Sequence, residues 1–381
     1  MLPFSYVVSS LLLVAGWGVF AYKSFKGFFE WKRTILDFPI MIFVIISFLS
    51  VLVSPDSAFS FYNCYNLVGR YVLTYYLVVQ SIDLKNIGQL KVFLSCISLS
   101  LFIVVIYGFM QAFLGIGTSE QIVWTDGAMF PGLKTRVFST WQNPNLLGGY
   151  FDLMLGLMAG MFLLIKHKIV RIVIAVLFCL TAFCLTLTYA RGACLSIALV
   201  IFVYSILYNR KVLLALIGLA VILLLSDATL VDRMTSIFTK MDTSSEMRLA
   251  FWESTIAMIL DHPLLGIGWG SYFMVYPNYD YYMQGNFIKI VHAHNMYLNF
   301  MAEIGLFGFA SYMVCFFGVI YKAFKAQVMK LDILVKAMFL GIGLGLSALA
   351  LNGFTDYVMF NTELSMLVWL FSGIVVSGYK N

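Results

Sequence analysis

The chain has 381 residues, of which 62% are hydrophobic and only 11% are charged. A soluble globular domain is about 45–50% apolar and about 25% charged, so this composition excludes an ordinary soluble protein. The net charge of +6 does not indicate nucleic-acid binding, because the basic residues never form a run with interleaved aromatic residues. The six cysteines lack CxxC spacing, which argues against a disulfide framework or a metal site.

Apolar blocks of about 15–22 residues recur along the chain, and a helix of that length crosses about 30 Å of hydrocarbon. They lack the alternating pattern of a membrane barrel, so the spans are expected to be helices. The sequence therefore predicts an all-α, polytopic transmembrane helical bundle of about 11 spans, within a range of 10–12. The expected spans are Pro3–Ala21, Ile35–Val53, Leu67–Ile82, Val92–Phe113, Leu146–Ile165, Ile172–Tyr189, Ala193–Tyr208, Val212–Ser226, Met296–Tyr321, Ala337–Leu351 and Leu364–Gly378.

Lysine and arginine are unevenly divided between the two sets of connecting segments. Sixteen of the 24 basic residues lie on one side, which is therefore expected to be cytoplasmic, with the N-terminus outside and the C-terminus inside. These sixteen are Lys23, Lys26, Lys32, Arg33, Lys85, Lys91, Lys166, Lys168, Arg171, Arg210, Lys211, Lys322, Lys325, Lys330, Lys336 and Lys380. The others lie on or near the outer face, where an anionic ligand is one reason for a cation: Arg70, Lys134, Arg136, Arg191, Arg233, Lys240, Arg248 and Lys289.

Two long segments are expected on the outer side, and loops of such length usually have a function. The predicted organisation is an N-terminal bundle at 1–226 of about eight spans, which includes an outer loop at 114–145. An extracytoplasmic loop follows at 227–295, and about three C-terminal spans follow at 296–381. Thr243 and Glu246 fit a capping box, so the second loop is expected to contain an amphipathic helix that runs to about Leu260.

The first outer loop ends with the sequence TRVFSTWQNPNLLGGY. Asn143 followed by Pro144 predicts the start of a helix. The free N–H groups of that helix start and the guanidinium group of Arg136 can both donate hydrogen bonds to a phosphate. The alternative is a capped helix whose preceding arginine only extends to the membrane interface.

Two further arginines stand where a cation is unfavourable. Arg191 lies between two apolar spans with almost no loop around it, so it needs a ligand or an acidic neighbour such as Asp152 or Glu303. Arg248 lies in the first turn of the predicted loop helix, where a cation opposes the helix dipole unless an anion is shared. Pairing with a glutamate of the same helix is the alternative.

A glycine-rich stretch, HPLLGIGWG, follows that helix. It has neither a preceding strand nor a GK[ST] ending, so a nucleotide-binding loop is rejected in favour of a tight turn or of flexible backbone near a substrate. The aromatic cluster beyond it predicts either an interfacial belt or sugar-stacking rings. Its members are Trp269, Tyr272, Tyr276, Tyr279, Tyr281 and Tyr282.

Two histidines, His292 and His294, precede the next expected span. A histidine near the interface can act as a general base on a hydroxyl, because its ordinary pKa lies near neutrality. A structural or capping role is the alternative for either one. Two histidines two positions apart, without a third ligand, do not predict a zinc site.

These pieces together resemble the O-antigen ligase and O-antigen polymerase superfamily of bacterial membrane glycosyltransferases. They occur in the order found in that superfamily. They are the R-x-F-x(4)-NPN stretch from Arg136 to Asn145, the Ala-Arg-Gly-Ala turn at Arg191, the R-x(3)-W…HPLLGIGWG stretch from Arg248 to Gly270, and the H-N-x(2)-L-x(4)-E-x-G stretch from His294 to Gly305.

The resemblance implies a GT-C-like glycosyltransferase that moves a glycan from an undecaprenyl diphosphate carrier to an acceptor hydroxyl on the outer face of the cytoplasmic membrane. It implies no cofactor and no metal. It also implies that Arg191 and Arg248 hold the diphosphate and that His294 acts as the base, which makes these three the expected catalytic residues. The expected diphosphate-binding or substrate-binding residues are Arg136, Asn143, Asn145, Trp252, His292 and Asn295.

The expected partners are the lipid-linked glycan donor, a glycan, lipid or protein acceptor and a polysaccharide chain-length regulator, and no nucleic acid. The sequence does not separate ligase from polymerase, because only the acceptor differs, and His292 remains a rival of His294. Ligases typically have one span more, so either their first helix is missing here or two spans are merged. The alternatives are a transporter or channel and an assembly scaffold; against a transporter, no paired half-helix interruptions are found.

Overall fold

The computed structural model describes residues 2–27, 31–117, 136–208, 213–214, 217–222, 231–232, 235, 243–280 and 290–379. The regular structure in these residues is helical, which confirms the predicted all-α class. Seven of the described helices are long and apolar enough to cross a membrane, and two shorter apolar helices cover Asp37–Val53 and Thr362–Ser377. About half of the expected span Val212–Ser226 lies outside the described residues, so the count of eleven spans stays a prediction.

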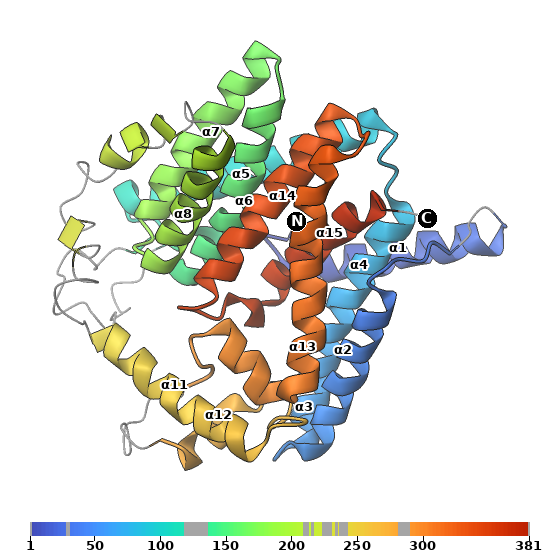
Figure 1. Cartoon of the computed structure of the whole chain (residues 1–381), viewed down its shortest axis with the longest axis vertical. Helices are drawn as coiled ribbons and strands as arrows, with labels where there is room; N and C mark the ends of the chain where they lie inside the picture. The colour runs from blue at the N-terminus through green and yellow to red at the C-terminus, as the bar shows by residue number, and fades with distance from the viewer. Residues whose placement is uncertain are drawn as a thin grey trace. The chain divides into compact units, whose positions relative to one another are not determined.

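Two compact units make up the chain, and each combines stretches that are far apart in the sequence (Figure 1). Unit 1 comprises Met1–Leu84, Arg248–Lys322 and Gly353–Asn381. Unit 2 comprises Lys85–Met247 and Ala323–Asn352. The division into three consecutive segments, which the sequence predicts from topology, stays a prediction.

Unit 1 is built around an aromatic core. Its main helices are α1 (Tyr6–Phe25), α2 (Asp37–Ser50), α3 (Ser57–Cys64), α4 (Arg70–Ser81), most of α11 (Thr243–Asp261), α12 (Tyr272–Val275), most of α13 (Met296–Lys325) and α15 (Thr362–Ser377). The indole ring of Trp369 on α15 lies 5.9–6.4 Å, between ring centroids, from the rings of Phe43, Tyr71, Tyr75 and Tyr312. Because buried aromatic rings contribute large apolar areas, this cluster joins α2, α4, α13 and α15.

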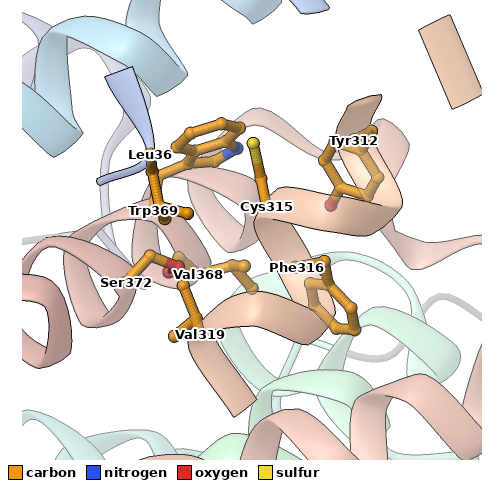
Figure 2. A pocket seen from close by; sticks show the side chains of 8 residues that line it. All are labelled: Leu36, Tyr312, Cys315, Phe316, Val319, Val368, Trp369 and Ser372. Carbon is orange, nitrogen blue, oxygen red and sulfur yellow. Dashed lines mark hydrogen bonds between the residues drawn. The ribbon is translucent and has the colours of Figure 1, made fainter. Parts of the chain in front are cut away.

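A narrow crevice opens beside this core (Figure 2). Its lining is mostly apolar and consists of Leu36, Tyr312, Cys315, Phe316, Val319, Val368, Trp369 and Ser372. The hydroxyl of Tyr312 and the indole nitrogen of Trp369 have no hydrogen-bond partner within the described part of the chain. No residue of the predicted site lines this crevice, so it is separate from the expected chemistry.

Helix α13 is broken at Gly305, where the backbone has φ 64° and ψ −176°. That conformation is essentially restricted to glycine. The break leaves the N–H group of Leu306 without a partner in its own helix, and this group donates instead to the carbonyl oxygen of Pro263, at 2.8 Å. A Cβ atom at position 305 would clash with the carbonyl group of Leu264.

The glycine-rich stretch after α11 bonds to the other side of the same break. The N–H groups of Ile267 and Gly268 donate to the carbonyl oxygens of Ala302 and Glu303, at 2.9 and 3.1 Å. Gly268 itself has φ 101°, which requires glycine. The HPLLGIGWG and E-x-G motifs are therefore the two halves of one structural joint, a tight turn docked onto a broken helix.

Unit 2 contains a closely packed pair of helices, α6 and α14. Its main helices are α5 (Ile87–Leu114), α6 (Pro144–Leu164), α7 (Lys168–Thr186), α8 (Arg191–Tyr208) and α14 (Ile333–Asn352). Gly156 faces Gly345 and Gly160 faces Gly341 so closely that a Cβ atom at any of these positions would clash with the opposite backbone. Small residues allow such close approach between membrane helices. Both helices are buried along most of their length.

A buried polar contact accompanies this glycine interface. One carboxylate oxygen of Asp152 accepts a hydrogen bond from the side-chain amide of Asn352, at 3.1 Å. Both residues are almost fully buried. An acidic side chain inside the bundle therefore has a polar partner on the facing helix, as polar groups at membrane depth require.

The joint at Gly305 predicts a loss of stability when this glycine is replaced. Gly305→Ala should lower the melting temperature of the detergent-solubilised protein, because backbone strain of about 1–3 kcal/mol adds to a clash with a backbone carbonyl. Gly18→Ala on α1 is the matched control, because a Cβ atom there would have no neighbour within 4 Å. Equal melting temperatures for the two variants would contradict the role given to the break.

Candidate functional site

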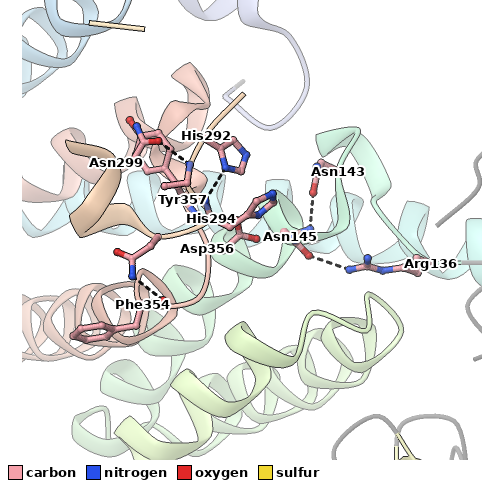
Figure 3. A network of polar contacts seen from close by, with 11 residues as sticks. Arg136, Asn143, Asn145, His292, His294, Asn299, Phe354, Asp356 and Tyr357 are labelled. Atoms are coloured by element: carbon pink, nitrogen blue, oxygen red, sulfur yellow. Dashed lines mark hydrogen bonds and ion pairs between the residues drawn. The ribbon is translucent and has the colours of Figure 1, made fainter. Parts of the chain in front are cut away.

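A histidine and an aspartate from two distant loops of unit 1 meet beside the start of α13 (Figure 3). The Nδ1 atom of His294 lies 3.1 Å from an Oδ1 atom of Asp356, which belongs to the loop before α15. The backbone of His294 has φ 48°, in the left-handed region that residues other than glycine rarely adopt. Strain of this kind is concentrated at functional sites, where the surroundings hold it.

Asn295 ties these two loops together. Its side-chain oxygen accepts hydrogen bonds from two backbone N–H groups in the first turn of α13, both at 3.0 Å, and so caps the helix. Its side-chain nitrogen donates to the carbonyl oxygen of Phe354, at 3.1 Å, and the N–H group of Met296 donates to the carbonyl oxygen of Gly353, at 2.7 Å. Asn295, expected to bind substrate, is thus a buried cap that fixes the distance between His294 and the Asp356 loop.

Asp356 is buried, and its surroundings favour its ionised form. Burial alone would raise the pKa of Asp356, but the hydrogen bond with His294 and the electrostatic interactions with His294, His292 and Arg248 together lower that pKa below its ordinary value of 3.8. The N–H group of Tyr357 also donates to Oδ1, at 2.8 Å. Because an ionised carboxylate only accepts hydrogen bonds, the Nδ1 atom of His294 is the donor in this pair, and in the neutral form of the ring the lone pair lies on Nε2.

The neighbouring His292 has the opposite character. Only 8% of its surface is exposed, and burial, reinforced by the charges of His294 and Arg248 and opposed by Asp356, lowers the pKa of His292 to about 3. Its Nδ1 atom accepts a hydrogen bond from the backbone N–H group of His294, at 3.2 Å. His292 is therefore neutral at pH 7 and supports the backbone of His294, whose own side chain is 32% exposed.

Helix α11 contributes three more side chains to this region of unit 1. Arg248 is half-buried, and its positive charge acts on both His292 and Asp356. The ring of Phe251 stacks on the imidazole of His294 with 5.9 Å between centroids and 23° between planes. The indole nitrogen of Trp252 is buried without a hydrogen-bond partner in the described residues. The cap predicted for Thr243 lies outside the side chains that the structure describes.

The tyrosines after the glycine-rich turn hold α11 in place. The hydroxyl groups of Thr255 and Tyr272 are 2.7 Å apart, and the rings of Phe251 and Tyr276 make an edge-to-face contact at 5.8 Å. Both tyrosines are buried, so they belong neither to an interfacial belt nor to a sugar platform. The last two tyrosines of the cluster lie outside the described residues.

A second predicted group of residues comes together within unit 2 (Figure 3). Asn143 caps α6 by accepting from the N–H group of Asn145, at 2.8 Å, with Pro144 as the first helical residue, which confirms the predicted helix start. Arg136 donates to the side-chain oxygen of Asn145 and to the carbonyl oxygen of Thr188, both at 2.9 Å. Arg136 therefore links the NPN stretch to the turn between α7 and α8.

Arg191 is the first residue of α8, directly after that turn. The turn is tight: Tyr189 has φ 52°, and the hydroxyl of Thr188 accepts a hydrogen bond from the N–H group of Ala190, at 3.1 Å. Arg191 is half-buried there. The hydrogen bond from Arg136 to Thr188 thus holds the segment that sets the position of Arg191, which makes Arg136 a positioning residue for it.

The donor atoms of His292, His294 and Asp356 all lie within 4.8 Å of one another. Two imidazoles and a carboxylate are the ligand types of zinc and similar transition metals. The hydrogen bonds between His294 and Asp356 and between His294 and His292 already account for this grouping without a metal. The sequence offered no third ligand because Asp356 lies far along the chain from the two histidines.

Among the described residues, Asp356 is a charged member of the site that the sequence did not predict. The available signal was weak: an acidic residue in a short connection between two expected spans, Ala337–Leu351 and Leu364–Gly378. The orientation of membrane helices depends mainly on lysine and arginine, so the charge pattern does not single out this carboxylate.

Comparison with known protein families agrees with the motif resemblance. Residues 175–313 match the model of a family described as O-antigen ligase. The matched range contains Arg191, Arg248 and His294, whereas Arg136 and Asp356 lie outside it. No curated protein matches the chain. The resemblance to the O-antigen ligase and O-antigen polymerase superfamily is confirmed by this match.

The buried His292 predicts a specific pH dependence of stability. Because the pKa of His292 in the folded protein lies below its ordinary value of 6.5, the unfolded chain takes up this proton first. The contribution of His292 to folding stability should therefore fall as the pH drops from about 6.5 towards 5, by at most about 1.4 kcal/mol per pH unit. The measurement is the melting temperature across this range.

His292→Gln should show a smaller decrease across the same range, because it removes the group that titrates. His262→Gln is the matched control. Because His262 is exposed, replacing it should leave the decrease in stability unchanged. Asp356 does not interfere, because the stability that its lowered pKa provides is lost only below about pH 3.8. A decrease of equal size in all three proteins would contradict the assignment.

Proposed function

We propose that this chain, which carries an O-antigen ligase domain, transfers a glycan from an undecaprenyl diphosphate carrier to an acceptor hydroxyl. The proposal places the reaction at the outer face of the cytoplasmic membrane, with the N-terminus outside and the C-terminus in the cytoplasm. The observation that carries it is the pair of His294 and Asp356 beside the cation Arg248. Such a pair is the machinery needed to deprotonate a hydroxyl.

In this proposal His294 is the general base. Its Nε2 atom accepts the proton of the acceptor hydroxyl while the oxygen forms a bond to the anomeric carbon of the glycan. The bond from that carbon to the diphosphate oxygen breaks, and the leaving diphosphate keeps the electron pair. Asp356 stabilises the imidazolium that forms, and it keeps Nδ1 protonated beforehand. His292 supports the strained backbone and does not titrate near neutrality.

The arginines act on the leaving group. Negative charge grows on the diphosphate as the sugar bond breaks, so a fixed guanidinium stabilises the transition state more than the ground state. We assign this role to Arg248 and, as the family resemblance implies, to Arg191. Arg136, Asn143 and Asn145 support Arg191 through the turn that precedes it.

Trp252 is a further substrate-binding residue in this proposal. The indole N–H group of Trp252 is buried and unpaired in the described residues, so it is a donor that a substrate oxygen can use. The reaction needs no metal and no cofactor. The partners are the lipid-linked donor, an acceptor that is a glycan, a lipid or a protein, and a chain-length regulator of the polysaccharide.

The base assignment predicts that His294→Ala reduces transfer from a purified lipid-linked donor by at least about 100-fold, as general bases usually contribute. Asp356→Asn should lower kcat without removing activity, because the imidazole loses its fixed tautomer but remains present. His262→Gln, an exposed histidine on the same loop, should be fully active. The assay contains EDTA throughout, and product is measured by mass spectrometry.

Full transfer by His294→Ala would overturn the base assignment, and loss of wild-type activity in EDTA would overturn metal independence. Two arms of the same assay identify the acceptor. In one, the donor is supplied alone, and a longer lipid-linked glycan indicates a polymerase. In the other, a candidate lipid or protein acceptor is added, and glycan on that acceptor indicates a ligase. Movement of donor across a vesicle membrane without any covalent product would support a transporter instead.

If both arginines bind the diphosphate, Arg191→Gln and Arg248→Gln should each lower kcat/KM. The loss should correspond to an increase of about 2–4 kcal/mol in the activation free energy. The lysine variants should recover part of this loss, because they restore charge but not the planar fork. Arg171→Gln is the control: this arginine lies over the ring of Phe162 at 4.6 Å and has no role in the proposal. If the glutamine variants at 191 and 248 matched this control, the assignment would fail.

A further inference from the structure

Arg70 is one of the arginines expected on or near the outer side, and the proposed transfer does not use it. It begins α4 directly after a π-helical turn, Tyr65–Gly69, within a helical run that is continuous from 57 to 81. The hydroxyl of the next residue, Tyr71, donates to the carbonyl oxygen of Met359, three residues beyond Asp356. Arg70 therefore lies in unit 1, next to a residue that contacts the Asp356 loop.

The contacts of Arg70 leave its charge uncompensated. Nη2 donates to the side-chain oxygen of Asn66, at 3.1 Å, and Cζ lies 4.2 Å from the centroid of the Tyr6 ring. Asn66 is oriented for this contact, because its side-chain nitrogen donates to the carbonyl oxygen of Tyr62, at 2.8 Å. Nη1 is buried without a hydrogen-bond partner, and no carboxylate pairs with Arg70 in the described residues. A guanidinium group with an unpaired buried donor is a costly arrangement in a membrane protein.

The start of α1 adds positive potential at the same place. Tyr6 is the first residue of this helix, and its first turn contains no acidic residue. The N-terminal end of a helix carries a partial positive charge, so it is unfavourable beside an arginine unless an anion lies between them. The contact between Arg70 and the Tyr6 ring brings this end of α1 near the guanidinium group, and both favour a negatively charged ligand.

The surroundings indicate what kind of anion fits. The side chains of Val7, Leu11, Tyr62 and Tyr65 on the adjoining helical turns are each more than 60% exposed. Exposed apolar surface in a membrane-spanning bundle faces acyl or isoprenoid chains. The guanidinium fork matches two oxygens of a phosphate group. We propose that Arg70, held in place by Asn66 and by the ring of Tyr6, binds the phosphate of a lipid headgroup.

The test is native mass spectrometry of the detergent-solubilised full chain titrated with three lipids. The probes are phosphatidylglycerol, undecaprenyl diphosphate and undecaprenol, which has the isoprenoid chain without phosphate. Arg70→Gln should bind phosphatidylglycerol or undecaprenyl diphosphate at least about tenfold more weakly than the wild type, because it loses charge-assisted hydrogen bonds. Binding of undecaprenol should not change.

Two further variants keep the test decisive. Arg70→Lys retains the charge, so it should bind more tightly than Arg70→Gln even if the glutamine variant is less stable. Arg171→Gln also removes an arginine that stacks on an aromatic ring, and it should bind like the wild type. Weakening confined to phosphatidylglycerol identifies a phospholipid site, and weakening confined to undecaprenyl diphosphate identifies the carrier.

Equal binding of both phosphate-bearing lipids to the wild type and Arg70→Gln overturns the inference. The readout is binding and needs no transfer. A fully active His294→Ala variant would therefore refute the proposed base and leave the Arg70 site untouched, so the two failures are distinguishable.

Discussion

A break in a membrane helix is stable only when other groups bond to the backbone atoms that the break sets free. In unit 1 that requirement is met at Gly305 by the stretch from Pro263 to Gly268. Backbone N–H groups of this stretch donate hydrogen bonds to carbonyl oxygens before the break in α13, and the carbonyl oxygen of Pro263 accepts one from the N–H group after it. Because α11 leads directly into this stretch, the joint also fixes the end of α11 against α13. Arg248 and Phe251 on α11 are thereby held beside His294, which precedes α13.

Two histidines separated by one residue show how burial assigns chemistry. His292 is enclosed, so its imidazole stays neutral and its ring nitrogen serves the backbone. His294 is partly open, and its Nδ1 atom faces an ionised carboxylate, so in the neutral form of the ring Nε2 is the atom left to accept a proton. Residue type alone makes the two equivalent, and only tertiary packing separates their roles.

Hydropathy and capping patterns predicted the parts of the fold that depend on local sequence. The all-α class and the helix start at Asn143 follow from apolar block length and from the preferences of asparagine and proline. The broken helix and the Asp356 contact were not predictable in that way, because each requires partners that are distant in sequence. The buried Tyr272 and Tyr276 were misread for a related reason: the helix that covers them was expected on the membrane surface or against the bundle, without a defined partner.

The π-helical turn at Tyr65–Gly69 has a consequence for how this chain tolerates insertions and deletions. A π turn is equivalent to one additional residue inside an α-helix. Removing a single residue there should therefore leave a regular α-helix from 57 to 81 with the segments on either side of the turn still in register. Removing a residue within α3 after Ser60 would instead rotate everything before it by about 100° relative to α4. Asn66 would stay within reach of Arg70, but α3 would lose its contact with the glycine-rich turn, where Ser60 donates to the carbonyl oxygen of Trp269. The helical register of this one segment thus couples the surroundings of Arg70 to the packing of the loop docked on α13.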